Sequence, residues 1–383
     1  MPGRLIKMPK LRFLQALSLI ILLGGATLPE SLAAPTVKAR QTQSAAKTRT
    51  INFAACLGDL YTMERSDYGL LPGRSLGRAE GSVRVPANVS VYLDVSYDGL
   101  KNLAALKNLQ ANDLGALSLA NKGRGFPIED SSLDCIAHLT GLQSLTIEQS
   151  DIGDEGVKKL ANLKNLEILN LNHTLISPAS IKTIATLSKL SELDLDGNRL
   201  NNQSLADLAN LKNLQKLQLR SCGLSAGALK YTQNWGNLCE LKLGGNKLGN
   251  EGIARLPIMP KIFELNLDRC DLSDQGLISL GKQTGMVKLF ARGNRISQAG
   301  LRGLAQARSL NYLNISGSPV DPQALAELRP LKKLSTVVIS TATSATPAAR
   351  QEALKTAQRA LPGVKVELDS PRLPLEIFAP LSR

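Results

Sequence analysis

The sequence predicts an α/β solenoid, with parallel strands on one face and short helices on the other. The frame Leu-x-x-Leu-x-Leu, or a close apolar variant of it, starts at Leu142 and recurs at one constant interval, at Leu166, Leu190, Leu214, Leu238, Ile262, Met286, Leu310 and Leu334. A second set of apolar residues, such as Val157, Leu160 and Leu163, has a spacing of three, which places them on one face of a short helix. A fixed period of about 20–50 residues is typical of stacked units that share one continuous core.

Composition agrees with such a repeat. A chain of 383 residues would by length alone suggest roughly two or three globular domains, but a solenoid lengthens by adding coils rather than by enlarging one core. Aromatic residues make up only 3% of the chain. The core is therefore expected to consist of stacked aliphatic side chains.

The net charge of +14 is unevenly distributed. Residues 1–88 carry +7, residues 89–340 carry +5 and residues 341–383 carry +2, so the repeat region mixes both signs. A nucleic-acid-binding protein concentrates positive charge on one face or stripe. No such face is evident from the sequence, and we therefore expect no nucleic-acid partner.

The N-terminus has the pattern of an export signal. Basic residues precede an apolar run over residues 14–23, and small residues mark a cleavage site near Ala33 or Ala34. We therefore predict a signal peptide over residues 1–34 and export to the periplasm, the cell surface or the medium. The alternative is an uncleaved membrane anchor, because residues 11–28 are almost long enough to span a bilayer.

The rest of the chain divides into five predicted parts. Residues 35–50 are polar and basic without apolar periodicity, and they are expected to form a flexible linker. The alternating stretch 81–86 is a strand within a predicted N-terminal cap over residues 51–89, because an uncapped end coil would expose its core. The remaining predicted parts are repeats over 90–340, a capping helix and strand over 341–369, and a tail over 370–383.

The coils follow the frame with two departures. The first two coils start at Ser90 and Leu114, and the interval from Leu114 to Leu142 is longer than the regular one by four positions. The four extra residues are expected in the loop 121–132, which contains Gly and Pro. At the C-terminal end, the frame is restored at Leu361, three positions later than the regular interval after Leu334, which gives a twelfth strand.

Helix boundaries are also marked in the sequence. A capping side chain stands directly before a proline at Ser177-Pro178 and at Asp321-Pro322, which is typical of a helix N-terminus. Residues 345–360 are expected to form a longer amphipathic helix. Glycine recurs at one position near the helix starts, where a small residue would allow close backbone packing: Gly156, Gly252, Gly276 and Gly300.

With this frame, period and set of turn residues over residues 90–366, the chain resembles the leucine-rich repeat superfamily. It is most similar to bacterial exported members whose coils are of the ribonuclease-inhibitor-like kind. The resemblance implies a horseshoe with the sheet on its concave face, and a non-enzymatic role in binding other proteins on that face. The coils of this chain are uniform in length, whereas cytosolic inhibitors alternate longer ones, so no individual partner is implied.

The outward positions of the strands are the candidate binding residues. Side chains alternate along a strand, so the third, fifth and seventh frame positions are expected on the concave face. Opposite charges then fall on adjacent coils, with Glu192 beside Lys216 and Asp196 beside Arg220, and likewise Glu264 beside Lys288 and Asp268 beside Arg292. The predicted partner-binding residues are Glu192, Asp194, Asp196, Lys216, Arg220, Lys288, Phe290, Arg292, Tyr312 and Asn314. The alternative is a self-compensating solvated surface, each pair contributing about 0–1 kcal/mol.

Phe290 is notable because outward aromatic residues are rare in this chain. Tyr312 stands on the next coil and Arg292 is close in sequence, and aromatic and Arg residues are frequent anchors of protein interfaces. The alternative is that Phe290 packs on the stems of Lys288 and Arg292, or fills space beneath a weak coil.

The cysteines are mostly assigned to structure. Cys222 and Cys270 occupy the ninth frame position, otherwise held by Asn, and lie two coils or about 10 Å apart, which is too far for a disulfide. Cys135 and Cys239 are expected to be partly exposed, and a Cys56–Cys135 bridge in the cap remains an alternative. The odd count of five leaves at least one thiol unpaired.

Nothing in the sequence predicts catalysis. His138 and His173 are not in a metal-type spacing, no serine lies on an elbow motif, and the glycines follow the coil period rather than forming a phosphate loop. His173 is expected to be a turn residue. We predict no catalytic residues, no cofactor and no metal. The predicted function is protein binding, and the alternative is an envelope scaffold whose basic N-terminal segment contacts an anionic surface.

Overall fold

The computed structural model describes residues 47–66, 69–120, 128–341 and 345–369. The predicted signal peptide, most of the predicted linker and the predicted tail lie outside these residues. Residues from Lys47 onward belong to one compact unit, and this unit is described here by itself.

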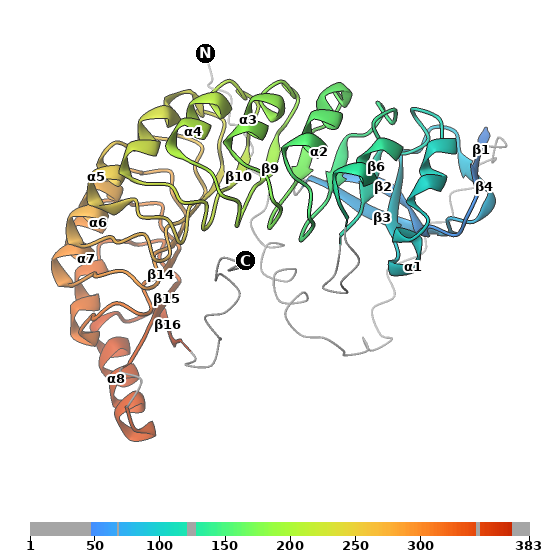
Figure 1. Cartoon of the computed structure of the whole chain (residues 1–383). Helices are drawn as coiled ribbons and strands as arrows, with labels where there is room; N and C mark the ends of the chain where they lie inside the picture. The colour runs from blue at the N-terminus through green and yellow to red at the C-terminus, as the bar shows by residue number, and fades with distance from the viewer. Residues whose placement is uncertain (1–46, 67–68, 121–127, 342–344, 370–383) are drawn as a thin grey trace, which may run out of the picture. The chain divides into compact units, whose positions relative to one another are not determined.

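An antiparallel cap precedes the repeats (Figure 1). Strand β1 (Thr48–Phe53) pairs with β4 (Gly81–Pro86), and β2 (Gly58–Ser66) pairs with both β3 (Gly69–Arg78) and the first coil strand. Strand β1 begins inside the range that the sequence indicated as linker. The reason is that pairing with β4 continues to Thr48 and sequesters Ile51 completely from solvent, a pairing between distant segments that local composition does not reveal.

The repeat strands form one parallel sheet of twelve strands, which β2 and β3 extend to fourteen. Consecutive strands pair residue by residue at the predicted period, for example Leu193 with Leu217, and across the longer early interval Leu117 pairs with Leu145. The predicted solenoid is therefore confirmed, with the sheet on the concave face. The strands are β5 (Val91–Val95), β6 (Ala116–Ser118), β7 (Ser144–Thr146), β8 (Ile168–Asn170), β9 (Glu192–Asp194), β10 (Lys216–Gln218), β11 (Glu240–Lys242), β12 (Glu264–Asn266), β13 (Lys288–Phe290), β14 (Tyr312–Asn314), β15 (Thr336–Ile339) and β16 (Lys365–Leu368).

Short helices return each coil on the convex face (Figure 1). The predicted N-caps are confirmed, because the Ser177 hydroxyl accepts the Ala179 N–H at 3.2 Å and the Asp321 carboxylate accepts the Gln323 N–H at 2.8 Å. The α-helices are α1 (Tyr97–Leu100), α2 (Asp154–Lys159), α3 (Pro178–Ile184), α4 (Asn202–Leu208), α5 (Gly249–Ala254), α6 (Asp274–Leu280), α7 (Gln298–Leu304) and α8 (Pro347–Ala360). The 3₁₀ helices are η1 (Leu103–Asn108), η2 (Asp130–Cys135), η3 (Leu160–Asn162), η4 (Ala226–Asn234) and η5 (Pro322–Leu328).

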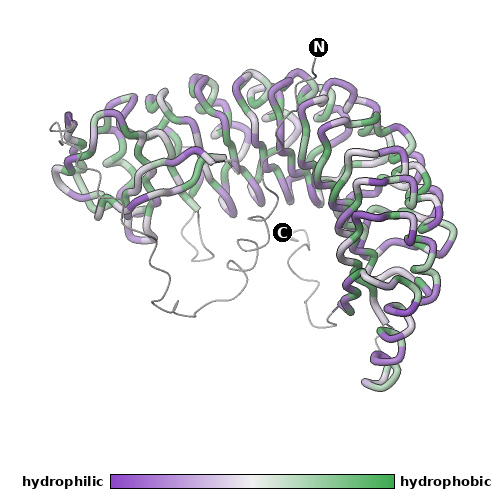
Figure 2. Tube along the Cα trace, turned by 180° about the vertical axis from the view of Figure 1, so that it is seen from behind, coloured by the Kyte–Doolittle hydropathy of each residue, from purple (hydrophilic) through white to green (hydrophobic). Residues whose placement is uncertain are grey.

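The core lies between the strand and helix layers and repeats once per coil. Figure 2 shows its apolar stretches recurring along the tube between hydrophilic turns. In the coil of β9, Leu190, Leu193 and Leu195 are all buried, and Asn198 is buried beside them. Gly252 confirms the expected close packing, since an added Cβ would lie 3.0 Å from the Cα of Ala226 in the preceding coil.

The last coil differs in register from the prediction. The sequence frame, restored at Leu361, places Val364 opposite Val337, whereas the structure pairs Val366 of β16 with Val337. The Pro362-Gly363 turn, in which Gly363 has φ 81°, comes before the strand and delays it by two positions. A shift of two preserves the alternation of side chains, so Val366 is still buried.

The five cysteines are all free thiols, so the alternative of a bridge between Cys56 and Cys135 is wrong. Cys135 is buried rather than partly exposed, because η2 turns it toward the apolar core of the N-terminal coils. Cys222 and Cys270 are fully buried, as their frame position predicted.

Candidate functional site

The concave face of the sheet consists of three columns of side chains that run across the coils. Because neighbouring strands pair in register, residues one repeat period apart stand next to one another in each column. The leucines between the columns point into the core and are buried. All ten predicted binding residues lie in these columns, but the structure divides them into two groups.

The first group surrounds a shallow hollow of about 150 Å³ over β7 to β10. Glu192, Asp194 and Lys216 line it, and the Lys216 ammonium lies 2.8 Å from the Glu192 carboxylate, which confirms that the two charges pair across coils. Six residues outside the predicted set complete the lining: Thr146, Ile168, Leu169, Asn170, Leu193 and Gln218. Apart from the two leucines, these residues occupy the same outward frame positions as the predicted binding residues. The repeat frame is therefore the signal that could have identified them.

A carboxylate with a raised pKa stands in this hollow. Burial, together with the nearby charge of Asp196, raises the pKa of Asp194 from 3.8 to about 6. Its oxygens accept the Asp196 backbone N–H at 3.0 Å and the Asn172 amide at 3.4 Å. The same Asn172 amide nitrogen also donates to Glu148 at 3.2 Å, so a polar network connects three coils.

Asp196 serves the fold more than the surface. Its side chain is 6% exposed, and its two oxygens bind the backbone N–H of Arg220 at 2.5 Å and the Arg220 guanidinium at 2.6 Å. The predicted pair is therefore present. It holds the ends of adjacent strands together, because one carboxylate satisfies both a backbone donor and a charged side chain.

The second group lies four coils further along, over β13 and β14. The rings of Phe290 and Tyr312 are 5.1 Å apart and tilted by 41°, and both side chains remain partly exposed. Phe290 therefore packs on the aromatic ring of the next coil. Such a pair contributes about 0.5–1.5 kcal/mol beyond the area it buries.

Asp268 lies beside Arg292 as predicted, but the Arg292 guanidinium has a different ion-pair partner. It lies 3.0 Å from the carboxylate of Asp369, which follows β16. Asp268 instead accepts the backbone N–H of Arg292 at 2.7 Å. The Lys288–Glu264 pair is present at 3.6 Å, and the Asn314 carbonyl accepts from the Ser316 hydroxyl at 2.8 Å.

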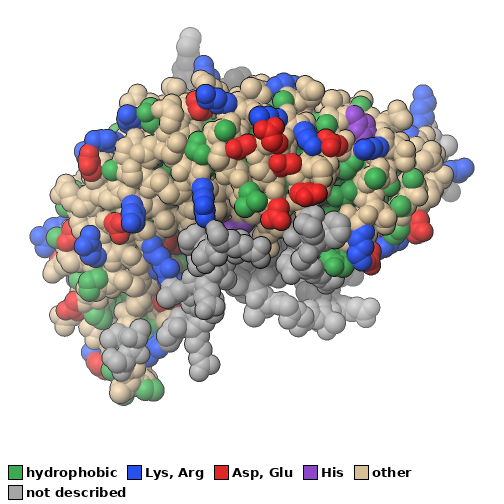
Figure 3. Space-filling model, in the orientation of Figure 1, with side chains coloured by type: hydrophobic (Ala, Val, Ile, Leu, Met, Phe, Trp, Pro, Cys, Tyr) green, Lys and Arg blue, Asp and Glu red, His purple; other side chains and the backbone are tan. Residues whose placement is uncertain are grey.

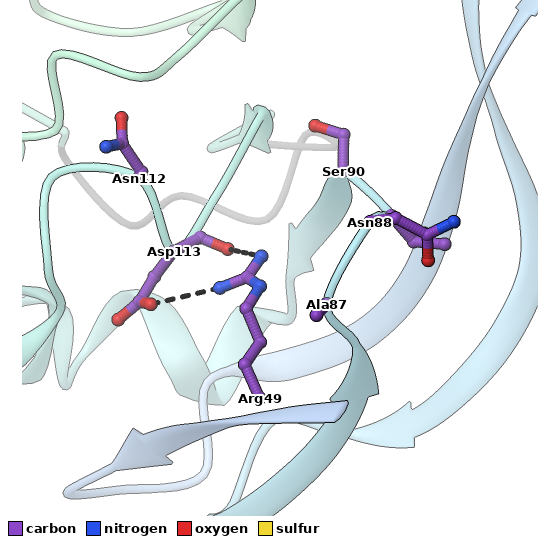
Figure 4. Close-up of a pocket in the computed structure, with 7 residues that line it drawn as sticks. Arg49, Ala87, Asn88, Ser90, Asn112 and Asp113 are labelled. Atoms are coloured by element: carbon purple, nitrogen blue, oxygen red, sulfur yellow. Dashed lines mark hydrogen bonds and ion pairs between the residues drawn. The ribbon is translucent and has the colours of Figure 1, made fainter. Parts of the chain in front are cut away.

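A larger open hollow of about 460 Å³ lies in the cap (Figure 4). The Arg49 guanidinium reaches across from β1 and binds both the carboxylate and the backbone oxygen of Asp113 at 3.1 Å. Asn88, Ser90 and Asn112 stand around this pair. The ion pair between Arg49 and Asp113 fixes the cap to the first coils.

Charged groups of both signs are distributed over the rest of the surface that the structure describes. On the face shown in Figure 3, both signs are interspersed, with acidic side chains gathered around α2. Within the described ranges, no three His, Cys, Asp or Glu side chains are arranged to hold a metal ion. No helix in those ranges is long and apolar enough to cross a membrane. His173 lies in a turn with φ 50°, as expected.

Comparisons with known proteins agree with this architecture. Two family models described as leucine-rich repeats match residues 140–200 and 260–281. The chain contains leucine-rich repeats. No curated protein matches the sequence of this leucine-rich repeat chain.

Solved structures of similar fold include two internalins from Listeria monocytogenes. Internalin C2 is 23% identical over 55% of this chain and 84% of its own, with a TM-score of 0.44. The internalin inlF is 18% identical over 75% of this chain and 94% of its own, with a TM-score of 0.44. The mouse RP105/MD-1 complex is 20% identical over 73% of this leucine-rich repeat chain and 48% of its own, with a TM-score of 0.50. At these identities the likeness concerns the fold alone.

Proposed function

We propose that this protein is a non-enzymatic binding module that engages a protein partner on its concave face. The observation that carries the proposal is the aromatic pair Phe290 and Tyr312, partly exposed on the concave side in a chain with few aromatics. A rigid aromatic pair offers a large contact area at low entropic cost, and such residues with a nearby arginine are typical anchors of interfaces.

The charged columns would form a polar border around this aromatic pair. Pairs such as Glu192–Lys216 are held in place before any partner arrives, so binding would order few additional side chains. The hollow at Asp194 lies four strands away from Phe290, or about 20 Å at the usual strand spacing. A partner that contacts both groups would bury an area typical of a stable protein interface.

We also propose that the protein is exported from a bacterial cell, with residues 1–34 removed. The basic and apolar pattern of this segment supports the proposal. N-terminal sequencing of protein recovered from the exported fraction tests it, and a sequence that begins at Met1 in membranes would instead favour an anchored form.

Cross-linking of the exported protein, followed by pull-down, tests the binding role. The double variant Phe290→Ala with Arg292→Ala is expected to weaken capture of the partner at least tenfold, on the scale of about 2 kcal/mol for a hot-spot residue. A matched control, Tyr231→Ala with Arg302→Ala, removes an aromatic residue and an arginine from η4 and α7 on the convex side and should leave capture unchanged. Equal capture by both variants would contradict a concave-face site and favour a scaffolding role.

A further inference from the structure

The turns that lead from helix to strand all lie along one edge of the sheet. This follows from the topology, because every coil strand is parallel and every helix returns the chain to the same edge. Side chains confirm that the turns of successive coils touch: the Asn213 amide donates to Ser188 O and the Asn237 amide to Lys212 O, both at 2.9 Å. We call this surface the helix-to-strand rim: residues 162–167, 186–191, 210–215, 234–239, 258–263, 282–287, 306–311 and 330–335.

This rim is strongly basic. It contains one carboxylate, Glu167, and eight cations, so its net charge is +7: the cations are Lys164, Lys189, Lys212, Lys261, Lys282, Arg308, Lys332 and Lys333. The equivalent strand-to-helix turns on the opposite edge contain four cations and five carboxylates, or −1, over 149–154, 173–178, 197–202, 221–226, 245–250, 269–274, 293–298 and 317–322. The sequence alone does not reveal this charge, because its basic residues are spread over successive coils and no single stretch contains them all.

The rim cations are exposed, and no described carboxylate neutralises them. All eight side chains belong to exposed residues, and none has a carboxylate partner among the residues that the structure describes. The ammonium groups of Lys189 and Lys261 donate to the neutral amides of Asn165 at 2.6 Å and Asn237 at 2.7 Å. The single carboxylate, Glu167, is itself paired with Arg65 of the cap at 2.7 Å.

Two exposed apolar side chains stand on the same rim. Ile258 is 66% exposed and Phe263 is 38% exposed, and Lys261 lies between them in one turn. The Lys288 ammonium lies 5.4 Å from the centre of the Phe263 ring. A basic surface with isolated aliphatic and aromatic side chains is the combination that interfacial proteins present to lipid headgroups.

Helix dipoles account for only part of this arrangement. Basic residues are favoured near helix C-termini, and the rim lies at that end of each helix. That effect does not explain why Ile258 and Phe263 are exposed there. Seven of the eight cations are lysines, which interact as point charges, whereas base and phosphate recognition in nucleic acids favours the planar fork of arginine and stacked aromatics. The composition therefore favours a lipid surface over a nucleic acid.

We propose that the helix-to-strand rim docks on an anionic membrane surface, with Ile258 and Phe263 entering the headgroup layer. The lysines supply the attraction to acidic headgroups, and the two apolar residues supply contact that salt does not screen. The proposal is independent of partner binding on the concave face, which stays accessible when one edge of the sheet is in contact with the membrane.

Vesicle binding by the chain from Pro35 tests the proposal. This form keeps the whole core, which lies between Ile51 and Val366, and removes the apolar leader that would insert by itself. Vesicles of phosphatidylcholine containing one-third phosphatidylglycerol are compared with pure phosphatidylcholine by co-sedimentation. Binding is expected only to the anionic vesicles and is expected to weaken as salt is added.

Two charge-reversal variants with the same change in net charge locate the surface. Lys189→Glu, Lys212→Glu and Lys261→Glu together should lower partitioning at least about a hundredfold, since each lysine near an anionic surface contributes roughly fivefold and each new carboxylate is repelled. The matched control on the opposite edge is Arg199→Glu, Lys247→Glu and Arg295→Glu, which should lower it far less. Equal losses in the two variants, or no binding of the unaltered chain to anionic vesicles, would overturn the proposal.

The apolar contact is tested separately. Ile258→Ser with Phe263→Ser should abolish the binding that persists in high salt, while Leu175→Ser with Ile278→Ser, which removes exposed apolar side chains elsewhere, should not. Circular dichroism checks that every variant is folded. Retention on duplex DNA that depends on the rim, without retention on vesicles, would assign the surface to nucleic acid and overturn the membrane assignment.

Discussion

The carboxylate of Asp196 binds Arg220 twice, once through the backbone N–H at 2.5 Å and once through the guanidinium at 2.6 Å. The two residues stand at the same position on adjacent coils, and Asp196 is 4% exposed. This contact therefore joins two repeats at the edge of the concave face, where the strands end.

Removing this carboxylate should destabilise the solenoid. Asp196→Ala removes the carboxylate from the part-buried backbone N–H and guanidinium of Arg220, which costs about 3 kcal/mol. Asp196→Asn keeps one carbonyl oxygen for the backbone donor and should cost less. Urea unfolding followed by circular dichroism measures both, and equal stability of the alanine variant and the unaltered chain would show that the contact contributes nothing.

Asp194 should make stability depend on pH. Its pKa is raised from 3.8 to about 6 in the folded state, mainly by burial, so the folded chain binds the proton more tightly than the unfolded chain. Its contribution is therefore favourable at low pH and is lost as the pH rises from about 4 through about 6. Asp194→Asn should raise the free energy of unfolding at about pH 7, by about 2 kcal/mol, and change it little at about pH 4.

Thermal unfolding of the two proteins across this pH range checks the sign. The comparison isolates Asp194, because the other titrating groups are common to both. A variant that is less stable than the unaltered chain at neutral pH would mean that the charged form is the one the fold favours.

The buried asparagines should be the most sensitive positions of the repeat. The Asn246 amide accepts the N–H groups of Cys222 and Leu224, both at 3.0 Å, and donates to Leu219 O and Leu243 O, both at 2.7 Å. Asn246 is 1% exposed, so Asn246→Ala leaves the N–H groups of Cys222 and Leu224 and the oxygen of Leu219 without this partner in the core, and leaves Leu243 O with the Cys270 thiol alone. We expect a loss of about 3 kcal/mol in the free energy of unfolding.

A surface asparagine provides the control. Asn237 belongs to an exposed turn and its amide donates to Lys212 O at 2.9 Å, where water can replace it. Asn237→Ala should cost less than about 1 kcal/mol. If the two variants unfold at the same urea concentration, burial of the amide is not what decides its contribution.

Substitutions at one position of the turn after the strand should have opposite effects on stability in two neighbouring coils. Ser221 and Gly245 occupy the same turn position, with φ 54° and 74°. Ser221→Gly removes the strain of a side chain in the left-handed region and should stabilise by roughly 0.5–1 kcal/mol. Gly245→Ala places a Cβ at 2.5 Å from the Ser221 hydroxyl and should destabilise. The melting temperatures of the two variants should shift in opposite directions, and shifts of the same sign would refute this account.

The sequence frame predicted most of the sheet, because the constant repeat period alone determines the pairing of the coil strands. A constant period determines which residues pair, so Glu192 beside Lys216 and Asp196 beside Arg220 followed directly from spacing. Of the antiparallel cap strands, β4 was predicted from the alternation over 81–86, whereas β2 and β3 were not. Strands β2 and β3 join the sheet through pairing between segments that have no repeat, and β2 contains register shifts around Tyr61.

Side-chain partners were predictable only when neighbouring coils supplied them. Arg292 pairs with Asp369, which comes after β16 and lies outside the regular frame, so the repeat spacing does not indicate that contact. The basic rim was missed for a different reason. Its lysines occupy the turns rather than the strands, and their shared edge becomes evident only when the coils are stacked.

Thiol accessibility provides a last test of the coil geometry. Cys222 and Cys270 are fully buried, and burial raises the pKa of Cys270 to about 12 and also raises that of Cys222, so neither should form a reactive thiolate near neutral pH. Cys135 is buried too, whereas Cys56 and Cys239 are partly exposed. A thiol reagent should therefore modify Cys56 and Cys239 in the native chain and all five cysteines after unfolding in denaturant. Mass spectrometry counts the labels. Fewer than five labels on the unfolded chain without a reductant would reveal a disulfide, and rapid native labelling of Cys222 would mean that the coil around it opens.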